Sequence, residues 1–442
     1  MSCSPGATLL PGTGVRQMHR KFDKITTFER RDAITYAAIR RWDQEDPLRH
    51  RREDFELPGG LIYMDGNSLG PLPKATRGRI EEVVAKEWGQ GLIRSWNEHR
   101  WIDAPLRVGD KIAKLIGARS GEVVVADSTS VNLYKLLGAA LAARPDRCVV
   151  LSEPGNFPTD LYMAEGAIGG ARSCPLQLRL ESAERILEAI DSNTAVVMLT
   201  HVHYKTAAIH DMRAITAKAH EHGALVIWDL SHSVGAIEVD LNGCEADMAV
   251  GCGYKYLNGG PGAPAFLFVS QRLQAELTSP LRGWMGHNRP FEFIDNYEPA
   301  EGIRRFLCGT PSILGVLSLE VGVDLMLRSR MQDIVQKSRW LSELFVDLIA
   351  DICPSLRLVS PANVSERGSH VSFAHPEGYA IMQALIERGV IGDFRAPDLL
   401  RFGFTPLYLR YQDVWDAAYT VADVVHSGCW ADPRYAVRAA VT

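Results

Sequence analysis

Short runs of β-branched and other apolar residues alternate with longer amphipathic stretches through the middle of the 442-residue chain. The runs have the composition of buried strands, and the stretches between several of them have the spacing of helices. This alternation is typical of parallel strands joined by helical crossovers. The predicted strands are EVVVAD at 122–127, CVVLS at 148–152, TAVVMLTHV at 194–202, ALVIWDL at 224–230, ADMAV at 246–250 and AFLFVS at 265–270.

The pattern changes toward both ends of the chain. Residues 34–60 predict a polar helix that breaks down before Pro58, and 211–223 predicts a helix that closes on Gly223. Beyond Pro311 a long helical pattern at 328–352 precedes short strands near 357–360, 369–376 and 399–409, which indicates a second, α+β region. We therefore predict a poorly ordered extension (1–30), an N-terminal part of a small domain with its linker (31–115), a large domain (116–310) and a C-terminal small domain (311–442).

Composition narrows the possible functions. A net charge of -5 offers no basic surface for nucleic acid or anionic lipid, and no uncharged apolar run is long enough to span a bilayer. The eight cysteines form no CxxC pair and no regular spacing, so they suggest neither a zinc site nor a disulfide framework. We expect reduced thiols, a cytoplasmic location and a small-molecule partner.

In an open parallel sheet, ligands bind beyond the carboxyl ends of the strands. Ser128, Thr129 and Ser130 follow the first predicted strand and begin a helical pattern, where free N–H groups and hydroxyls can bind a phosphate. The same residues are also ordinary helix caps. After the second strand, Phe157 could cover a flat ring and Asp160 falls in a first helical turn, although a plain strand-to-helix turn has the same composition.

Charged side chains lie at the ends of two later predicted strands, 224–230 and 246–250. Asp229 ends an apolar strand three residues before His232, and a carboxylate there is costly to bury without a cation. Lys255 follows the strand ADMAV within GCGYKYLNGGPG, where partial desolvation would favour a neutral, nucleophilic amine. Helix capping and a solvated lysine are the structural alternatives. A phosphate site, a stacking ring, an acid for a pyridinium and a lysine for an aldehyde together predict pyridoxal 5′-phosphate.

The motifs YMDGNSLGPLP, DSTSVNLYK, NFPTD, WDLSHSVG, GYKYLNGGPG, GWMGH and RFGFTPLY, spread over residues 63–408, resemble those of the kynureninases. That family has the aspartate-aminotransferase-like fold type I of pyridoxal phosphate enzymes. The resemblance implies an α/β fold: a mainly parallel seven-stranded sheet flanked by helices, and a smaller α+β domain built from the N- and C-terminal segments.

The resemblance also implies roles for individual residues. Lys255 would carry the cofactor covalently and move the substrate's α-proton, and Asp229 would pair with the pyridinium nitrogen. Tyr254 would line the pocket, and we choose it as the proton donor during carbon–carbon cleavage. The remaining cofactor contacts implied are Thr129, Ser130, Phe157, Asp160, Thr200 and His232.

Further positions match contacts to the substrate and to a second subunit. Arg401 would bind the substrate's α-carboxylate and Asn67 would be a further substrate contact, although an Asn in a turn is commonly turn chemistry. Trp284 and Thr310 match positions that reach the cofactor phosphate from the neighbouring subunit, which implies a homodimer with shared active sites.

The implied reaction is hydrolysis of L-kynurenine to anthranilate and L-alanine in tryptophan degradation, with 3-hydroxykynurenine as a second candidate substrate. A cysteine desulfurase or selenocysteine lyase is the enzymatic alternative, but it needs a cysteine nucleophile in a mobile loop. A non-catalytic nucleotide-binding module is the other alternative, and it would be colourless. For His201 and His203 in HVH we favour a structural role over metal binding, because no further ligand stands at suitable spacing.

Overall fold

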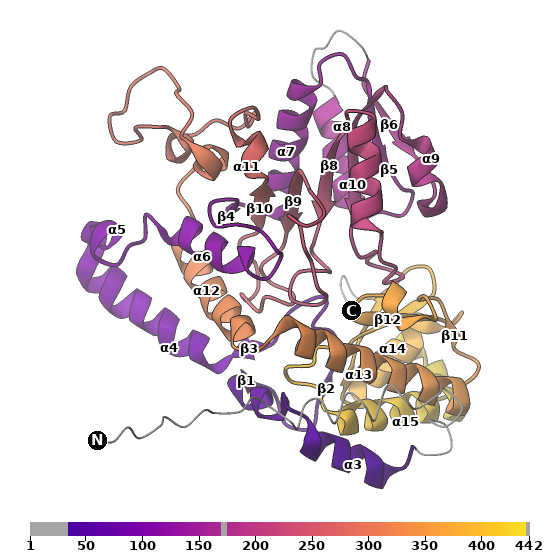
Figure 1. Ribbon diagram of the computed structural model, residues 1–442. Helices are drawn as coiled ribbons and strands as arrows, with labels where there is room; N and C mark the ends of the chain where they lie inside the picture. Colours follow the sequence, from indigo (N-terminus) through magenta and orange to yellow (C-terminus); the bar gives the residue numbers. More distant parts are fainter. Residues whose placement is uncertain (1–33, 169–174, 439–442) are drawn as a thin grey trace, which may run out of the picture.

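A computed structural model describes residues 34–168 and 175–438, and the predicted extension at 1–30 lies outside the described residues. Its centre is a seven-stranded sheet in the order β4-β10-β9-β8-β7-β5-β6 (Figure 1). Strand β10 runs antiparallel to both of its neighbours, whereas the contacts among β9, β8, β7, β5 and β6 are parallel. The strands are β4 (Val123–Val125), β5 (Val149–Ser152), β6 (Gln177–Leu180), β7 (Thr194–Thr200), β8 (Leu225–Asp229), β9 (Met248–Gly251) and β10 (Phe266–Val269).

All six predicted strands form, so the mainly parallel α/β fold is confirmed. Strand β6 was not predicted because it lies at the sheet edge and its sequence, QLRL, alternates polar and apolar residues that stay partly exposed. The inner strands read as continuous apolar runs because both faces are covered. Val124 and Val196 belong to one buried cluster, and Val123 and Val197 belong to another.

Helices pack on both faces of this sheet (Figure 1). Helix α7 (Thr129–Ala143) packs on α8 (Pro158–Ile168), α10 (Met212–Glu221) packs against β8, and α6 (Ala104–Ala113) packs beside β4. Asp211 caps α10 through the Ala214 N–H, and Gly223 follows its end with a φ of 71°, so the predicted helix at 211–223 is confirmed. Shorter helices are α4 (Lys74–Glu82), the π-helix Val83–Gly91, α5 (Ser95–Glu98), α9 (Ile186–Ala189) and α11 (Gln271–Gln274).

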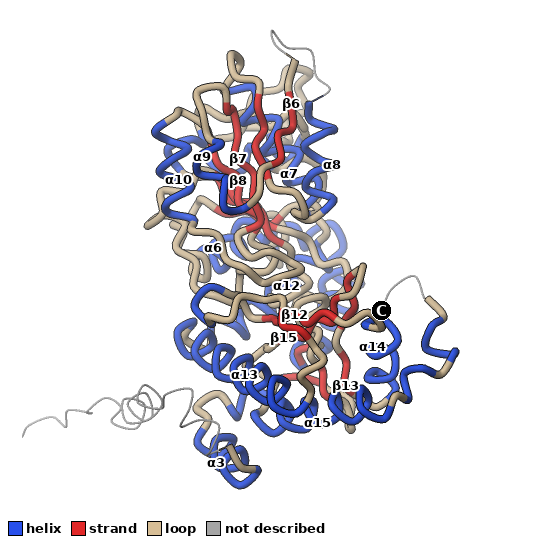
Figure 2. The backbone as a smooth tube through the Cα atoms, turned by 90° about the vertical axis from the view of Figure 1, so that its right-hand side faces the viewer, coloured by secondary structure: helices blue, strands red, loops and turns tan. Residues whose placement is uncertain are grey.

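A second sheet lies in the other half of the molecule (Figure 2). It has the antiparallel order β11-β12-β15-β14, with helices α13 and α15 packed together beside it. The ring of Phe345 in α13 lies 5.0 Å from that of Phe402 in β15, tilted by 54°, and this contact helps to fix the helix on the sheet. The elements are α12 (Ile313–Leu327), α13 (Met331–Ile352), β11 (Arg357–Leu358), β12 (His370–Ala374), α14 (Gly378–Glu387), β14 (Asp393–Arg395), β15 (Leu399–Gly403) and α15 (Tyr411–Ser427).

The N-terminal segment packs against these C-terminal elements. Helix α3 (Tyr36–Glu45) contacts α15, and β2 (Ile62–Tyr63) pairs in parallel with β13 (Val390–Ile391). The predicted polar helix, expected to break down before Pro58, is confirmed only for Tyr36–Glu45 and is wrong beyond it. The helix ends at Glu45 because Pro47 disfavours a helical conformation at Asp46, which is extended. A 3₁₀ turn at Arg49–Asp54 follows, and then β1 (Phe55–Glu56) pairs with β3 (Leu72–Pro73).

Within residues 34–168 and 175–438, no helix has the length and apolar content that crossing a bilayer requires.

Five of the described cysteines are free: Cys244, Cys252, Cys308, Cys353 and Cys429. Cys148 is disulfide-bonded, so the prediction of reduced thiols is wrong at that position; no CxxC or regular spacing marked it in the sequence.

Candidate active site

A cavity of about 130 Å³ lies where the central strands end. Every cofactor-binding residue predicted between positions 129 and 255 lines it, although these residues follow five different strands. The sheet therefore gathers them at one edge, as expected for an open α/β fold. The lining residues are Ser128, Thr129, Ser130, Phe157, Thr159, Asp160, Thr200, Tyr204, Asp229, Ser231, His232, Tyr254 and Lys255.

One wall of the cavity is the N-terminus of α7. Ser128 caps the helix by accepting a hydrogen bond from the Val131 N–H, which leaves Thr129 and Ser130 in the first turn. The first N–H groups of a helix have no acceptor inside it, and the helix dipole adds positive potential there. This wall therefore suits an anion such as a phosphate.

Another wall carries two buried carboxyl groups. Asp229, the last residue of β8, is 4% exposed and accepts a hydrogen bond of 2.8 Å from the Ser231 N–H. Asp160 is 1% exposed, and its Oδ2 has no hydrogen-bond partner among the described residues. Burial raises the pKa of both carboxyls, and the charge of Asp229 raises the pKa of Asp160 further. The pair therefore fits a group that brings a protonated ring nitrogen and a further donor into the cavity.

Lys255 reaches the cavity from the loop after β9. Its Nζ lies 3.0 Å from Nε2 of His232, which is 3% exposed. Burial, reinforced by the charge of Lys255, lowers the pKa of His232 well below its usual value. The imidazole is therefore neutral and can hold the amine in place without adding a second positive charge.

Aromatic side chains complete the cavity. Phe157, just before α8, is 40% exposed, and its ring meets that of Tyr204 edge-on at 5.2 Å. The Lys255 Nζ lies 6.0 Å from the Phe157 ring centre and 5.9 Å from that of Tyr254. Burial raises the pKa of Tyr254, so its hydroxyl keeps its proton at neutral pH and can donate it.

The GNSLG turn lies directly beside the lysine loop. The Gly70 N–H donates to the Tyr254 carbonyl at 2.8 Å, and a Cβ at position 70 would lie only 2.3 Å from the Lys255 carbonyl oxygen. Glycine is therefore required for this close approach. The contact places Asn67 and Ser68 between the lysine loop and the second sheet.

Comparisons with known proteins agree with this geometry. A family model described as the Kynureninase C-terminal domain matches residues 334–421. Over 406 residues the chain is 50% identical to a kynureninase of Pseudomonas fluorescens, covering 90% of this chain and 98% of that protein. The chain belongs to the kynureninase family.

Solved structures of similar fold come from other enzymes. The apo cysteine desulfurase of Thermococcus onnurineus NA1 superposes with a TM-score of 0.73 at 20% identity, covering 85% of this chain and 97% of that one. A mutant of C-DES with glycine covalently linked to its PLP cofactor gives 0.74 at 17% identity, covering 84% and 99%. At these identities the likeness concerns the fold alone, and it confirms the predicted fold class.

Two predicted phosphate contacts do not line the cavity of this single kynureninase chain. Trp284 is 39% exposed and stacks on Phe293 with ring centres 6.4 Å apart, in a separate hollow. Thr310 is exposed on the loop before α12. Their action from a neighbouring subunit stays a prediction.

The two predicted substrate contacts also lie outside the cavity wall. Arg401 is 1% exposed; its Nε donates to Oδ1 of Asp393 at 2.8 Å, and its NH1 donates at 2.6 Å to the carbonyl of Tyr204, which lines the cavity. Asn67 is fully buried, and its amide has no partner among the described residues. A Cβ at Gly403 would lie 2.0 Å from Oδ1 of Asn67, so that glycine makes room for the turn.

The sequence interpretation missed three residues here: Tyr204, Asp393 and Arg395. Asp393 and Arg395 alternate on β14, and Asp393 pairs directly opposite Arg401 in the sheet. The signal was present in GDFRAPDLLR, where two charged residues alternate just before the predicted arginine. It was overlooked because a strand of three residues has too little apolar pattern to be recognised.

The HVH segment makes no metal site in the described parts of the chain. His203 Nε2 lies 2.8 Å from the Gly155 carbonyl, and its Nδ1 accepts from the Lys205 and Thr206 N–H groups. Burial lowers the pKa of His201 to about 4. Nowhere in 34–168 or 175–438 do three His, Cys, Asp or Glu side chains form a group able to hold a metal ion.

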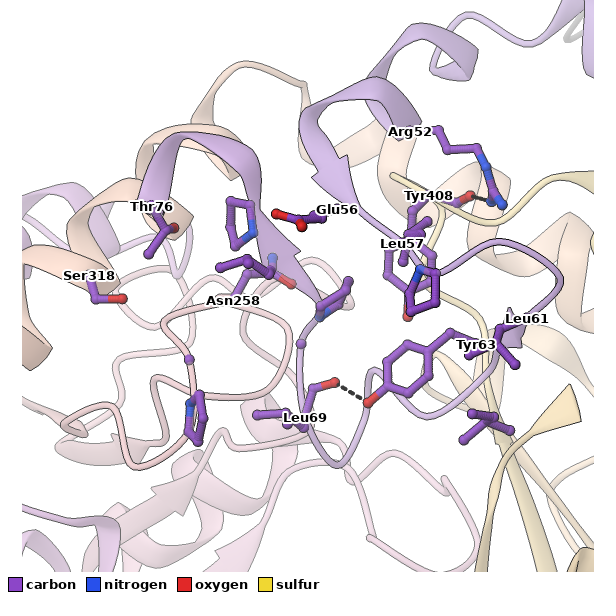
Figure 3. A pocket seen from close by; sticks show the side chains of 18 residues that line it. Arg52, Glu56, Leu57, Leu61, Tyr63, Leu69, Thr76, Asn258, Ser318 and Tyr408 are labelled. Atoms are coloured by element: carbon purple, nitrogen blue, oxygen red, sulfur yellow. Dashed lines mark hydrogen bonds between the residues drawn. The ribbon is translucent and has the colours of Figure 1, made fainter. Parts of the chain in front are cut away.

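A larger cavity of about 360 Å³ lies behind the GNSLG turn (Figure 3). Its wall is mostly hydrocarbon, and the Tyr63 hydroxyl donates to the Leu69 carbonyl at 2.7 Å. Arg52, at its rim, is already engaged by the Tyr408 carbonyl and by Asp413. Glu56, the other charged lining residue, pairs with Arg77, so both charges of this cavity are already engaged.

Asp65 comes directly before the GNSLG turn at residues 66–70, and it should make the stability of the fold depend on pH. Burial and the nearby Asp393 raise the pKa of Asp65 to about 7, compared with about 3.9 in an unfolded chain. Between these values the folded state binds more protons than the unfolded state, so this residue lowers stability as the pH rises from 4 to 7. Asp65→Asn should therefore raise the free energy of unfolding at pH 8 and change it little below pH 4.

Urea unfolding of the cofactor-free protein at both pH values would measure this difference. Asp423→Asn is a matched control, because Asp423 is largely exposed and pairs with Arg388. The raised pKa of Asp65 would be contradicted if both variants gained the same free energy of unfolding. It would also be contradicted if Asp65→Asn gained as much at pH 4 as at pH 8.

Proposed function

We propose that the chain hydrolyses L-kynurenine: water adds across the bond between Cβ and the ketone carbon, releasing anthranilate and L-alanine. The observation that carries this proposal is the 50% identity that extends over 98% of a kynureninase. The cavity supports it with a lysine, two buried acids and a helix N-terminus at the places a pyridoxal phosphate enzyme requires. Anthranilate fluorescence on adding L-kynurenine to the holoenzyme tests the proposal, and no release above background would refute it.

The cofactor of this reaction is pyridoxal 5′-phosphate, and the cavity residues fit it. Thr129 and Ser130 at the start of α7 would hold the phosphate, Phe157 would cover the ring, and Asp229 would keep the ring nitrogen protonated. The unpartnered Oδ2 of Asp160 would accept from a ring substituent. When bound, this group withdraws electrons from the substrate's α-carbon.

The chain's own residues supply the proton transfers. Lys255 removes the α-proton of the substrate and later returns a proton to the product, and neutral His232 orients its amine at 3.0 Å. Thr200 lines the same cavity, and its hydroxyl donates to the buried side chain of Asn156. We assign the donation of a proton during carbon–carbon cleavage to Tyr254, because it lines the cavity with its ring centre 5.9 Å from the Lys255 Nζ and carries a hydroxyl that is protonated at neutral pH.

Tyr254→Phe tests this last assignment. The substitution keeps the ring beside Lys255 and removes the donor, so kcat for anthranilate release should fall by about 10²-fold while the visible spectrum of the holoenzyme stays unchanged. Stopped-flow absorbance should show that substrate binding keeps its rate. Wild-type turnover by the variant would remove Tyr254 from this role.

We further propose a homodimer with shared active sites. Trp284 and Thr310 are exposed and outside the cavity of their own chain, which suits residues that serve a neighbouring one. The aromatic rings of Phe291 and Phe293, which are 61% and 76% exposed, surround Trp284 and supply apolar surface for such a contact.

Cysteine desulfurase activity has little support from the site. No cysteine lines the cavity within the described residues, and Cys252, the nearest in sequence to Lys255, is buried with its pKa raised by that burial. A sulfide assay with L-cysteine beside the anthranilate assay separates the two activities. We also propose kynurenine over its 3-hydroxy derivative, to be settled by comparing kcat/KM, and a cytoplasmic location.

A further inference from the structure

Helix α7, whose N-terminus forms the anion-binding wall of the cavity, carries a completely buried lysine. Lys135 is 0% exposed, and it does not line the cavity itself. A buried ammonium group is costly unless acceptors surround it. Its Nζ donates to Oδ2 of Asp127 and, at 2.8 Å, to the carbonyl of Phe306. Lys135 therefore joins two segments that lie far apart in the chain.

The first segment is the turn that leads into the anion-binding wall. Asp127 lies between β4 and α7 with a φ of 46°, a left-handed conformation that residues other than glycine keep only when their surroundings support it. That support comes from the Ala265 N–H, which donates to the Asp127 carbonyl at 2.8 Å, and from Lys135, which holds the carboxylate. We therefore expect the placing of Thr129 and Ser130 to depend on Lys135.

The second segment belongs to the part of the chain that is proposed to serve a neighbouring subunit. Phe306 is fully buried at the end of a short 3₁₀ turn, and Thr310 follows shortly after it. Between them, the carbonyl of Cys308 accepts from the N–H of Met285 at 3.2 Å, directly after Trp284. Holding the Phe306 carbonyl in place thus also helps to fix the segments that carry Trp284 and Thr310.

We propose that Lys135 is a positioning residue for the cofactor's phosphate on both sides of the shared site. Within its own chain it would fix Thr129 and Ser130 through Asp127. For the neighbouring subunit it would fix the segment that carries Thr310. This inference rests on the proposed function for the cofactor and for the dimer.

The test compares two aldehydes that differ only in the phosphate. Cofactor-free wild type and Lys135→Met are titrated with pyridoxal 5′-phosphate and with pyridoxal, followed by the visible absorption of the lysine-bound aldehyde. Methionine keeps the apolar stem and removes the donor. Lys135→Met should weaken binding of pyridoxal 5′-phosphate by about tenfold and leave binding of pyridoxal unchanged, because only the phosphate uses the segments that Lys135 holds.

Lys337→Met is the matched control. Lys337 is 4% exposed and also binds one acid, Asp46 at 2.7 Å, and one carbonyl, that of Pro406 at 2.6 Å, but it lies outside the cavity wall. It should bind both aldehydes as the wild type does. An unchanged affinity of Lys135→Met for pyridoxal 5′-phosphate would overturn the inference, and so would an equal loss for both aldehydes, which indicates a structural effect.

A second variant covers poor folding of Lys135→Met. Combining it with Asp127→Asn removes both charges, so that neither is left without its partner, and asparagine tolerates the left-handed conformation at this position. The double variant should show the same loss that is specific to the phosphate. If it bound pyridoxal 5′-phosphate as tightly as the wild type, the proposed role of Lys135 would be wrong.

Hybrid dimers test the contribution to the neighbouring subunit. A tagged chain with Lys135→Met and Lys255→Ala is assembled with untagged wild type and purified by its tag, so that only the wild-type chain can hold a lysine-bound aldehyde. This site should bind pyridoxal 5′-phosphate more weakly than in a hybrid whose tagged chain carries Lys255→Ala alone. Equal affinities would overturn the proposed action on the neighbour, whereas failure to recover any untagged chain would refute the dimer.

These experiments measure cofactor binding and need no turnover. They therefore stand even if the wild-type holoenzyme releases no anthranilate, which is the outcome that refutes the proposed function instead.

Discussion

Replacing Lys255 by alanine should abolish anthranilate release, with kcat falling by roughly 10⁴-fold or more, because one amine both carries the cofactor and moves the α-proton. The structure leaves that amine no nearby substitute. His232, 3.0 Å away, lines the same cavity, but burial and the charge of Lys255 lower its pKa, and its imidazole has no primary amine with which to carry the cofactor. The variant should also lose the visible band of the lysine-bound cofactor, so absorption spectra and single-turnover kinetics measure the same event independently.

Lys205→Ala is the control for loss of a nearby positive charge. Its Nζ lies 5.6 Å from the ring centre of Tyr204, which lines the cavity, yet Lys205 is not itself a lining residue. This variant should keep the visible band and most of the activity. A colourless Lys205→Ala protein, or a coloured and active Lys255→Ala protein, would contradict the assignment of the amine.

The Lys255→Ala chain also tests the proposed sharing of active sites between two subunits. Mixed after unfolding with a Trp284→Ala chain, it should form hybrid dimers in which one site receives both intact residues. Random assembly places such hybrids at half of the dimers, so about one quarter of wild-type activity should return if Trp284 serves the partner's site. If each chain served its own site, mixing would restore nothing.

The sequence was most informative where strands end. Asp160, Asp229 and Lys255 could be brought together from the order of residues alone, because the carboxyl ends of parallel strands meet at one edge and a charged residue there needs a partner. The inner strands could also be predicted, because burial on both faces of the sheet gives continuous apolar runs in the sequence.

The packing of segments that lie far apart in the chain could not be predicted from the sequence. The pairing of Asp393 with Arg401 depends on the register of β14 and β15, and the engagement of Arg401 by Tyr204 and Ser68 depends on three segments meeting. No local pattern carries that information. The same holds for Glu45 as the end of α3, where a single proline overrode a favourable helical composition.

Replacing Asp229 by asparagine should separate catalysis from stability. Activity should fall by roughly 10³-fold, because a neutral amide cannot keep the ring nitrogen of the cofactor charged, and a preorganised charge in a buried site has effects of this size. The cofactor-free protein should be as stable as the wild type or more stable. Burial raises the pKa of Asp229, so its charged form is costly in the folded protein, and a neutral amide at this position removes that cost.

Asp247→Asn provides the contrast that makes this result specific. Asp247 is also fully buried, but it is bonded to Arg272, to His220 at 3.1 Å and to the Val226 N–H at 2.8 Å, so loss of its charge should destabilise the fold. Thermal unfolding of both cofactor-free variants beside kinetic assays of the holoenzymes measures the two effects. If Asp229→Asn lowered the melting temperature as Asp247→Asn does, Asp229 would be a structural acid. If it kept wild-type kcat, another group would have to hold the cofactor's nitrogen, and Asp160 would be the first candidate, because the substitution removes the charge that, after burial, raises its pKa.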